Sequence, residues 1–175
     1  TKYKKRLNDQ RFKSLLDSLT KLPNRAAFDE RYNHEMHLFN VQASDVTLVV
    51  IDVDYFKSIN DRFGHTAGDI TLQVIAKALQ KSIEKTDFIA RYGGEEFVLL
   101  MPGTSLEHAI PQLEKLKNNI KKIPFKFKDK QIEITVSLGA TQFKQGDTLL
   151  KAFDRADDAL YEAKNAGRDR LCIRK

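Results

Sequence analysis

The chain has 175 residues and a hydrophobic content of 41%, which is enough for one globular domain with a proper core. Its 30 lysines and arginines outnumber its 24 acids and give a formal net charge of +6, but they cluster without interleaved stacking aromatics, which argues against nucleic acid as a partner. No apolar run approaches the roughly 18 residues of a membrane span, and the single Cys172 excludes an internal disulfide and is compatible with a reducing cytoplasm.

Residues 1–16 are predicted to form a helix. They are charged, with apolar positions at Leu7, Phe12 and Leu15, and no capping residue precedes them. We expect the end of a linker (stalk) helix that begins upstream, followed by one domain over residues 17–175. A cloning remnant is the alternative.

The first strong strand signal is a nearly unbroken aliphatic and β-branched run over residues 46–53, after a helix that begins near Pro23. This run predicts a central strand buried on both faces. Asp52 and Asp54 would point to one face if the strand continued, although Asp54 could equally cap a following helix. An aspartate at the end of a buried strand is costly unless it is paired or metal-bound, so Asp52 is the better ligand candidate.

A tight β-hairpin is predicted from apolar runs over residues 88–92 and 97–101. Its tip, residues 93–96, reads Gly-Gly-Glu-Glu. Glycines without a Cβ let the backbone approach a bulky anion, and the two acids would repel that anion unless a cation lay between them. The tip therefore suggests metal and phosphate together, with a solvated acidic hairpin as the alternative.

The remaining elements are predicted from periodicity and turn signals. They are a helix after the turn at residues 64–69, a helix over 106–120, a second hairpin that turns at 129–130 and runs on to residue 140, a helix over 149–166 capped by Gly167, and an edge strand over 171–173. This order predicts an α+β fold, with helices packed on a mainly antiparallel sheet.

These motifs resemble those of the GGDEF-domain diguanylate cyclases, in the Gly-Gly-Glu-Glu-Phe form of the signature. Five blocks match in the family's order, and together they are far more specific than any one alone. The blocks lie at residues 17–25, 52–61, 64–69, 93–97 and 163–168. The resemblance implies a roughly five-stranded sheet wrapped by helices, similar to nucleotidyl cyclase catalytic domains and polymerase palms.

The activity that the resemblance implies is the condensation of two GTP into cyclic di-GMP with loss of two pyrophosphates, by a two-metal mechanism across a homodimer. It also implies a domain that faces the cytoplasm, in a full-length protein with an upstream sensory or membrane region. A catalytically silent module that binds GTP or cyclic di-GMP is the main alternative, and a related cyclase or transferase that uses ATP is another.

The resemblance also assigns roles to the acids and to one lysine. Asp52, the backbone carbonyl of Val53 and Glu95 are the expected metal ligands, and such oxygen donors suit Mg²⁺ or Mn²⁺. Since Glu95 and Glu96 alternate in direction along a regular strand, we place only Glu95 in the metal site, and either could deprotonate the attacking hydroxyl. Lys57 is expected to supply positive charge to the phosphates.

Other positions match the family's residues that contact the phosphates. They are the backbone amides of Tyr55 and Phe56, the glycines Gly93 and Gly94, and the side chains of Lys164 and Arg168. Lys164 and Arg168 are spaced i, i+4, so they share a helix face if the helix persists to Gly167. Two solvated cations that complement the helix dipole are the alternative.

Asn60 and Asp69 match the positions that read guanine in the family, with His65 lining the pocket. Guanine presents adjacent N1–H and N2–H donors that a carboxylate accepts as a pair, whereas adenine offers an acceptor at N1. As alternatives, Asp69 could only complement a helix dipole and His65 could only fill a turn.

The chain departs from the family at the Arg-x-x-Asp site for product inhibition. The matching positions hold Glu84 and Asp87, so an acid replaces the arginine. Lys85 is one position off and, on a helix, would point about 100° away. We therefore expect no tight feedback inhibition through this site.

Overall fold

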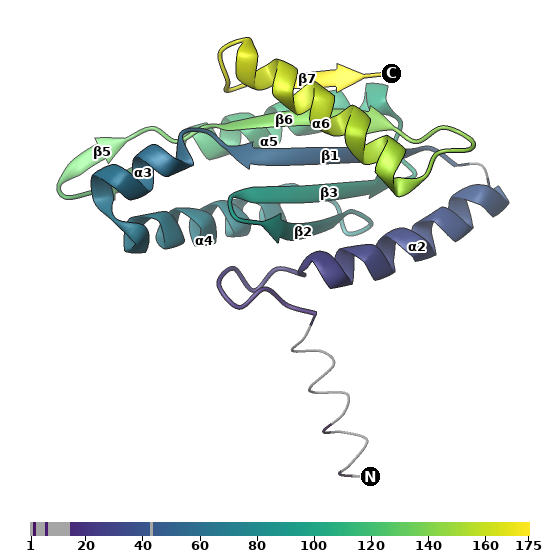
Figure 1. Ribbon diagram of the computed structural model, residues 1–175, viewed down its shortest axis with the longest axis horizontal. Helices are drawn as coiled ribbons and strands as arrows, with labels where there is room; N and C mark the ends of the chain where they lie inside the picture. The colour runs from purple at the N-terminus through teal and green to yellow at the C-terminus, as the bar shows by residue number, and fades with distance from the viewer. Residues whose placement is uncertain (1, 3–5, 7–14, 43) are drawn as a thin grey trace.

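The computed structural model describes residues 2, 6, 15–42 and 44–175 (Figure 1). Most of the helix predicted over residues 1–16 lies outside these residues, so the linker helix and the domain boundary after it stay predictions. The described part is an α+β domain, as predicted, with helices on both faces of a five-stranded sheet. None of the described helices combines the length and apolar character that a membrane span requires.

The sheet has the strand order β2-β3-β1-β6-β7 and is antiparallel except where β7 runs parallel to β6. Its strands are β1 (Val46–Val53), β2 (Phe88–Gly93), β3 (Glu96–Pro102), β6 (Val136–Gln142) and β7 (Leu171–Arg174). The central position of β1 confirms the prediction from its unbroken apolar run.

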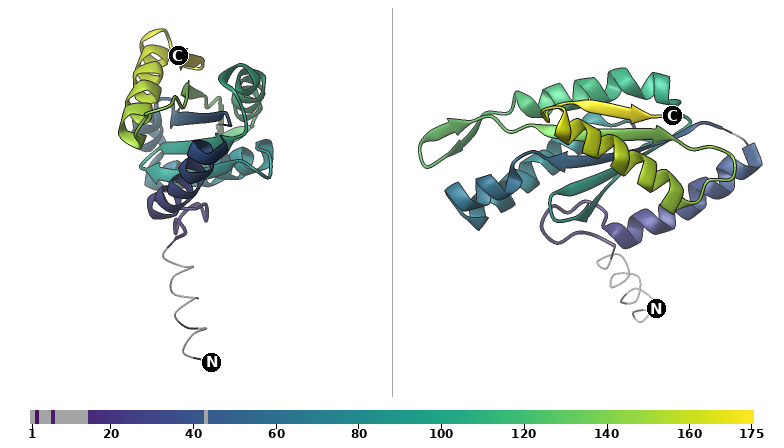
Figure 2. Two further views of the ribbon diagram at one scale, coloured as in Figure 1. Left: turned by 90° about the vertical axis from the view of Figure 1, so that its right-hand side faces the viewer. Right: turned by 45° about the horizontal axis from the view of Figure 1, so that its top comes forward.

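Alternate residues of β1 supply two separate cores. Val49 and Ile51 belong to the core under α4 and α5, whereas Leu48 and Val50 belong to the core under α2 and α6. Figure 2 shows these helix pairs on opposite sides of the sheet. The helices are α2 (Arg25–Gln42), α3 (Phe56–Phe63), α4 (His65–Ser82), α5 (Leu106–Lys121) and α6 (Leu149–Asn165). Because both faces of β1 are covered, its end is a rigid platform for polar groups.

One predicted element, the second hairpin, differs from the structure. The second hairpin is only β4 (Phe125–Phe127) and β5 (Lys130–Ile132), while β6 is a separate strand of the main sheet. Lys128 and Asp129 turn this hairpin with φ angles of 51° and 62°. Period-two alternation continues through the link between β5 and β6, so the pattern alone could not show where one sheet ends and the next begins.

Candidate active site

Most of the predicted site residues lie at the end of the sheet where β1 ends, β3 begins and α6 ends, on the left of Figure 1. The pairing of β1 with β3 sets Asp52 directly opposite Glu96. The backbone N–H of Val53 donates to the carbonyl of Glu95 at 3.3 Å. The structure thus joins the acidic end of β1 to the tip of the β2–β3 hairpin.

Burial and crowding of like charges act on these acids together. Burial raises the pKa of Asp52, the Lys164 ammonium lowers it, and neighbouring carboxylates raise it again. Burial also raises the pKa of Glu96 to about 7, with the carboxylate of Asp157 as the next cause. A cation placed among these acids would relieve their repulsion and favour their charged forms.

The donor chemistry of this site fits a hard divalent cation. Within the described residues, no three His, Cys, Asp or Glu side chains converge as an all-protein metal cage. Mg²⁺ usually takes one or two carboxylates and completes its shell with waters and substrate phosphates. Asp52, the carbonyl of Val53 and Glu95 are oxygen donors at the junction of β1 and the hairpin, so they fit such an ion.

Asp54 has partners at this site that the sequence did not predict. It does not cap α3, whose first turn follows Tyr55 at φ 56° without a side-chain cap. Instead its buried carboxylate accepts hydrogen bonds from Thr135 and Ser137, and it lies 3.3 Å from the Nζ of Lys164. The period-two placement of two aspartates was visible, but the partners on β6 and α6 are distant in sequence.

Lys164 and Arg168 do not share a helix face, so that expectation is wrong. Helix α6 ends at Asn165, and Arg168 lies beyond it with φ 64°. Its guanidinium stacks over the ring of Tyr55 at 4.7 Å. Lys164 lies 2.8 Å from Asp52. The two cations therefore approach the site from a helix end and a turn.

The predicted base-reading residues lie on α3 and α4, beside the acidic site. Asn60 Oδ1 is buried without a hydrogen-bond partner, against the backbone of Gly68. A Cβ on that glycine would lie 2.9 Å from Asn60 Cγ, so the glycine allows the Asn60 side chain to pack this closely on α4. Asp69 and His65 are exposed on α4. The exposed carboxylate of Asp69 is therefore the acceptor of this group that a ligand N–H can reach.

The glycine tip is tied to the start of the domain by Arg91. Gly94 takes φ 44° in the turn, and its carbonyl accepts hydrogen bonds from the Arg91 guanidinium at 2.9 and 3.0 Å. The same guanidinium contacts the carboxylate of Asp17 at 3.2 Å. Asp17 also accepts hydrogen bonds from Thr20. The sequence interpretation assigned no role to Arg91, since its partners lie 3 and 74 positions away.

The residues at the inhibition-site positions form a turn between α4 and β2, not a helix. The prediction that Lys85 points about 100° away on a helix is therefore wrong. The backbone N–H of Glu84 donates to Asp87 Oδ2 at 3.1 Å, and the N–H of Asp87 donates to the carbonyl of Glu84 at 3.0 Å. The Asp87 carboxylate is thus already engaged by a hydrogen bond within this turn.

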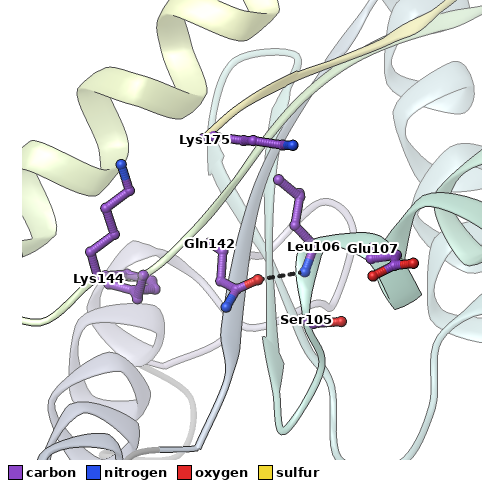
Figure 3. Close-up of a pocket in the computed structure, with 7 residues that line it drawn as sticks. Ser105, Leu106, Glu107, Gln142, Lys144 and Lys175 are labelled. Atoms are coloured by element: carbon purple, nitrogen blue, oxygen red, sulfur yellow. Dashed lines mark hydrogen bonds between the residues drawn. The ribbon is translucent and has the colours of Figure 1, made fainter.

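A separate pocket of about 330 Å³ lies at the opposite end of the sheet, where β6 ends (Figure 3). Gln142 accepts a hydrogen bond from the backbone N–H of Leu106 there, at 2.8 Å, and Lys144 and Lys175 lie at its edge. None of the predicted site residues lines it.

Comparison with known proteins identifies the family. The model of the diguanylate cyclase GGDEF domain matches residues 14–170. The chain therefore belongs to the GGDEF diguanylate cyclase family. It is 52% identical over 94% of its length to diguanylate cyclase DgcP of Pseudomonas aeruginosa, and 39% identical over 90% to diguanylate cyclase VdcA of Vibrio cholerae. It spans only 25% and 46% of those two relatives.

Solved structures show the same fold. The coiled coil and GGDEF domain of DgcB from Caulobacter crescentus, in complex with c-di-GMP, superposes with a TM-score of 0.94 at 30% identity, covering 99% of this chain and 92% of that one. The active GGEEF domain of a diguanylate cyclase from Vibrio cholerae gives 0.81 at 32% identity, with 87% and 97% covered. The residues that match the signature thus stand on a fold shared with these domains.

Proposed function

We propose that this domain condenses two GTP into cyclic di-GMP and releases two pyrophosphates. The observation that supports this most is the register that sets Asp52 against the Glu95–Glu96 tip, with Lys164 between Asp52 and Asp54. Acids alone would repel a triphosphate, and a lysine among them supplies a counter-charge. Relatives named diguanylate cyclases support the same reaction.

The chain's own groups suit a metal-assisted phosphoryl transfer. Asp52, the Val53 carbonyl and Glu95 would hold Mg²⁺ or Mn²⁺, which when bound lowers the pKa of the 3′-hydroxyl and stabilises charge on the phosphoryl oxygens. Glu95 or Glu96 takes the proton of that hydroxyl. Asp52 lies near the end of β1 and Glu95 immediately precedes β3, and the hydrogen bond from the Val53 N–H to the Glu95 carbonyl ties these two segments together.

In each half of the reaction, the 3′-oxygen of one GTP forms a bond to the α-phosphorus of the other. The bond from that phosphorus to the oxygen bridging the α- and β-phosphates breaks, and pyrophosphate leaves with the electron pair. Lys57 and the amides of Tyr55 and Phe56, at the start of α3, hold the phosphates. Lys164 and Arg168 hold the terminal phosphates.

Product analysis tests this proposal directly. The protein is incubated with Mg²⁺ and either GTP or ATP, and the products are separated by chromatography and mass spectrometry. We expect cyclic di-GMP and pyrophosphate from GTP and no dinucleotide from ATP. GTP binding without product would identify the silent signalling module, and a product from ATP would identify a related cyclase.

Guanine selection is assigned to Asn60 and Asp69. The placement of Asn60 supports this, since it packs against Gly68, next to the exposed Asp69, so both residues lie where α3 and α4 meet. We expect Asp69→Ala to weaken GTP binding roughly 10- to 100-fold, because the N1–H and N2–H pair loses its acceptor. Calorimetry with GTP and ATP measures this, with Glu107→Ala, an exposed helical acid at the other end of the sheet, as control. Full affinity and discrimination in Asp69→Ala would remove this assignment.

Catalysis is expected to need a transient antiparallel homodimer, since one hairpin site holds one GTP and the attacked phosphorus belongs to a second. An upstream stalk helix would raise the local concentration of partner domains at the cytoplasmic side. Specific activity should therefore rise with enzyme concentration, in parallel with the dimer fraction from sedimentation. Constant specific activity down to a demonstrably monomeric sample would contradict this.

Tight product inhibition through the Glu84–Asp87 turn is not expected. Glu84 offers no donors to a dianionic ligand, and Asp87 is engaged within its own turn. Titration of the protein with cyclic di-GMP should show no low-micromolar binding at this turn, and Glu84→Arg, which restores the family's arginine, should create it. Low-micromolar binding that disappears in Asp87→Ala would show that the site works without an arginine.

A further inference from the structure

We propose that Asp54 is a positioning residue, which holds Lys164 over the site and fixes the turn that presents Arg168. This inference rests on the proposed function only for what the two cations then do, which is to bind substrate phosphates. Asp54 itself is too enclosed to meet a substrate, because its side chain has 0% exposure. Its effect on the reaction must therefore pass through the groups that it contacts.

Four donors converge on this one carboxylate. Oδ1 accepts from the Ser137 hydroxyl at 2.6 Å and lies 3.3 Å from Lys164 Nζ. Oδ2 accepts from the Thr135 hydroxyl at 2.7 Å and from the backbone N–H of Asp169 at 2.9 Å. These donors belong to β6, the chain leading to it, α6 and the turn after α6. A buried carboxylate with four donors is stabilised in this arrangement, because moving it would leave buried polar groups without partners.

Lys164 is the cation that faces this buried anion. Its ammonium lies between Asp52 Oδ1, at 2.8 Å, and Asp54 Oδ1, at 3.3 Å. An ammonium has three N–H donors, so two contacts to the acids leave one for a phosphate oxygen. A lysine side chain loses much rotamer freedom when it binds a ligand, and anchoring it beforehand reduces that loss.

The same carboxylate also fixes the turn after α6. Arg168 and Asp169 both take positive φ, 64° and 48°, which is unfavourable for residues with a side chain. The hydrogen bond from the Asp169 N–H to Asp54 stabilises this conformation. This turn also places the Arg168 guanidinium 4.7 Å over the ring of Tyr55, at the start of α3. The Asp54 carboxylate thus fixes the positions of both cations that are predicted to bind the terminal phosphates.

A double-mutant cycle tests whether Asp54 acts through Lys164. We expect Asp54→Asn and Lys164→Met each to lower kcat/KM for GTP by roughly 100-fold. If Asp54 positions Lys164, the double variant should be only a few-fold worse than the worse single variant. Multiplication of the two losses in the double variant would show that Asp54 acts independently of Lys164 and would overturn the proposal.

Asp147→Asn is the matched control for this cycle. Asp147 also anchors a cation of α6, with its Oδ2 2.6 Å from the Arg155 guanidinium, but it precedes the opposite end of that helix. We expect the kcat/KM of the Asp147→Asn variant to stay within about twofold of that of the unchanged protein, when it is measured well below the unfolding temperature of the variant. A loss as large as that of Asp54→Asn would show that any anchor of α6 has the same effect, and the specific role of Asp54 would fall.

A second measurement needs neither nucleotide nor turnover. In protein with ¹⁵N-labelled lysine, the ammonium signal of Lys164 should be ordered and protected from exchange at low temperature, and Asp54→Asn should remove it. Lys117, 13% exposed and 3.3 Å from Glu114, should keep its signal in both proteins. An unchanged Lys164 signal in Asp54→Asn overturns the proposal. Absence of cyclic di-GMP from the unchanged protein would instead refute the proposed function and leave this measurement to decide the positioning.

Discussion

Asp52→Asn and Glu95→Gln are each expected to lower the rate of cyclic di-GMP formation by about a thousandfold or more, since each removes an anionic metal ligand while keeping the side chain's size. Neither change should unfold the protein. Burial raises the pKa of Asp52, so its charged form costs the folded state free energy that neutral asparagine does not. We therefore expect the unfolding temperature to stay the same or rise slightly.

Turnover and thermal unfolding of the same samples check this expectation. Glu107→Gln serves as the control, since this exposed acid on α5 lies at the other end of the sheet and should leave the rate unchanged. Mg²⁺ titration of the metal-free variants by calorimetry adds a readout that does not depend on turnover. Product formation at the normal rate in either variant would remove that residue from the metal site.

The elements that the sequence predicted well are those whose signal is local. An unbroken apolar run predicted the strand at Val46–Val53, and periodicity predicted the helix after residues 64–69, which is α4, with Leu72, Ile75 and Leu79 buried at helical spacing. The hairpin was predicted by two apolar runs around a glycine pair, and its strands are β2 and β3. In each case the pattern that defines the element lies within the element itself.

The features that the sequence did not predict depend on partners that are far apart in the chain. Asp54 meets donors more than 80 positions away, and Arg91 meets Asp17 across 74 positions. A single sequence shows the donors and acceptors but not which of them the fold pairs. The end of α6 was predicted within one residue, but the conformation of the turn after it was not, because nothing local in the sequence requires Arg168 and Asp169 to take positive φ.

These two missed contacts join the start and the end of the domain to the same site. Arg91 links the segment around Asp17 to the carbonyl of Gly94, and Asp54 links the turn after α6 to the end of β1. A shift of either segment would therefore move groups at the site.

Gly139→Ala is expected to cause the largest loss of stability, about 3 kcal/mol or more, because α6 packs directly on the backbone of β6 at this position. A Cβ there would overlap the carbonyl oxygen of Ala156 and the backbone N of Leu160, and would lie 2.9 Å from the Cα of Leu160. No flexible side-chain end can move aside, so the helix itself must shift. Denaturant unfolding measures the loss.

Two comparisons test whether the clash with the backbone of α6 causes the loss of stability. Gly103→Ala measures the strain of a positive φ without a clash, since Gly103 has φ 71° and open space around it, and it should lose only about 1 kcal/mol. Gly139 is not among the positive-φ glycines, so a larger loss in Gly139→Ala comes from the clash. Adding Leu160→Ala to Gly139→Ala should not restore stability, because the clash is with backbone atoms and not with the leucine side chain. Recovery in that double variant would mean that side-chain packing sets the distance between α6 and β6. Since α6 carries Lys164, a displaced helix should also lower turnover in the protein that remains folded, so Gly139 couples the packing of the sheet to the placement of a phosphate-binding cation.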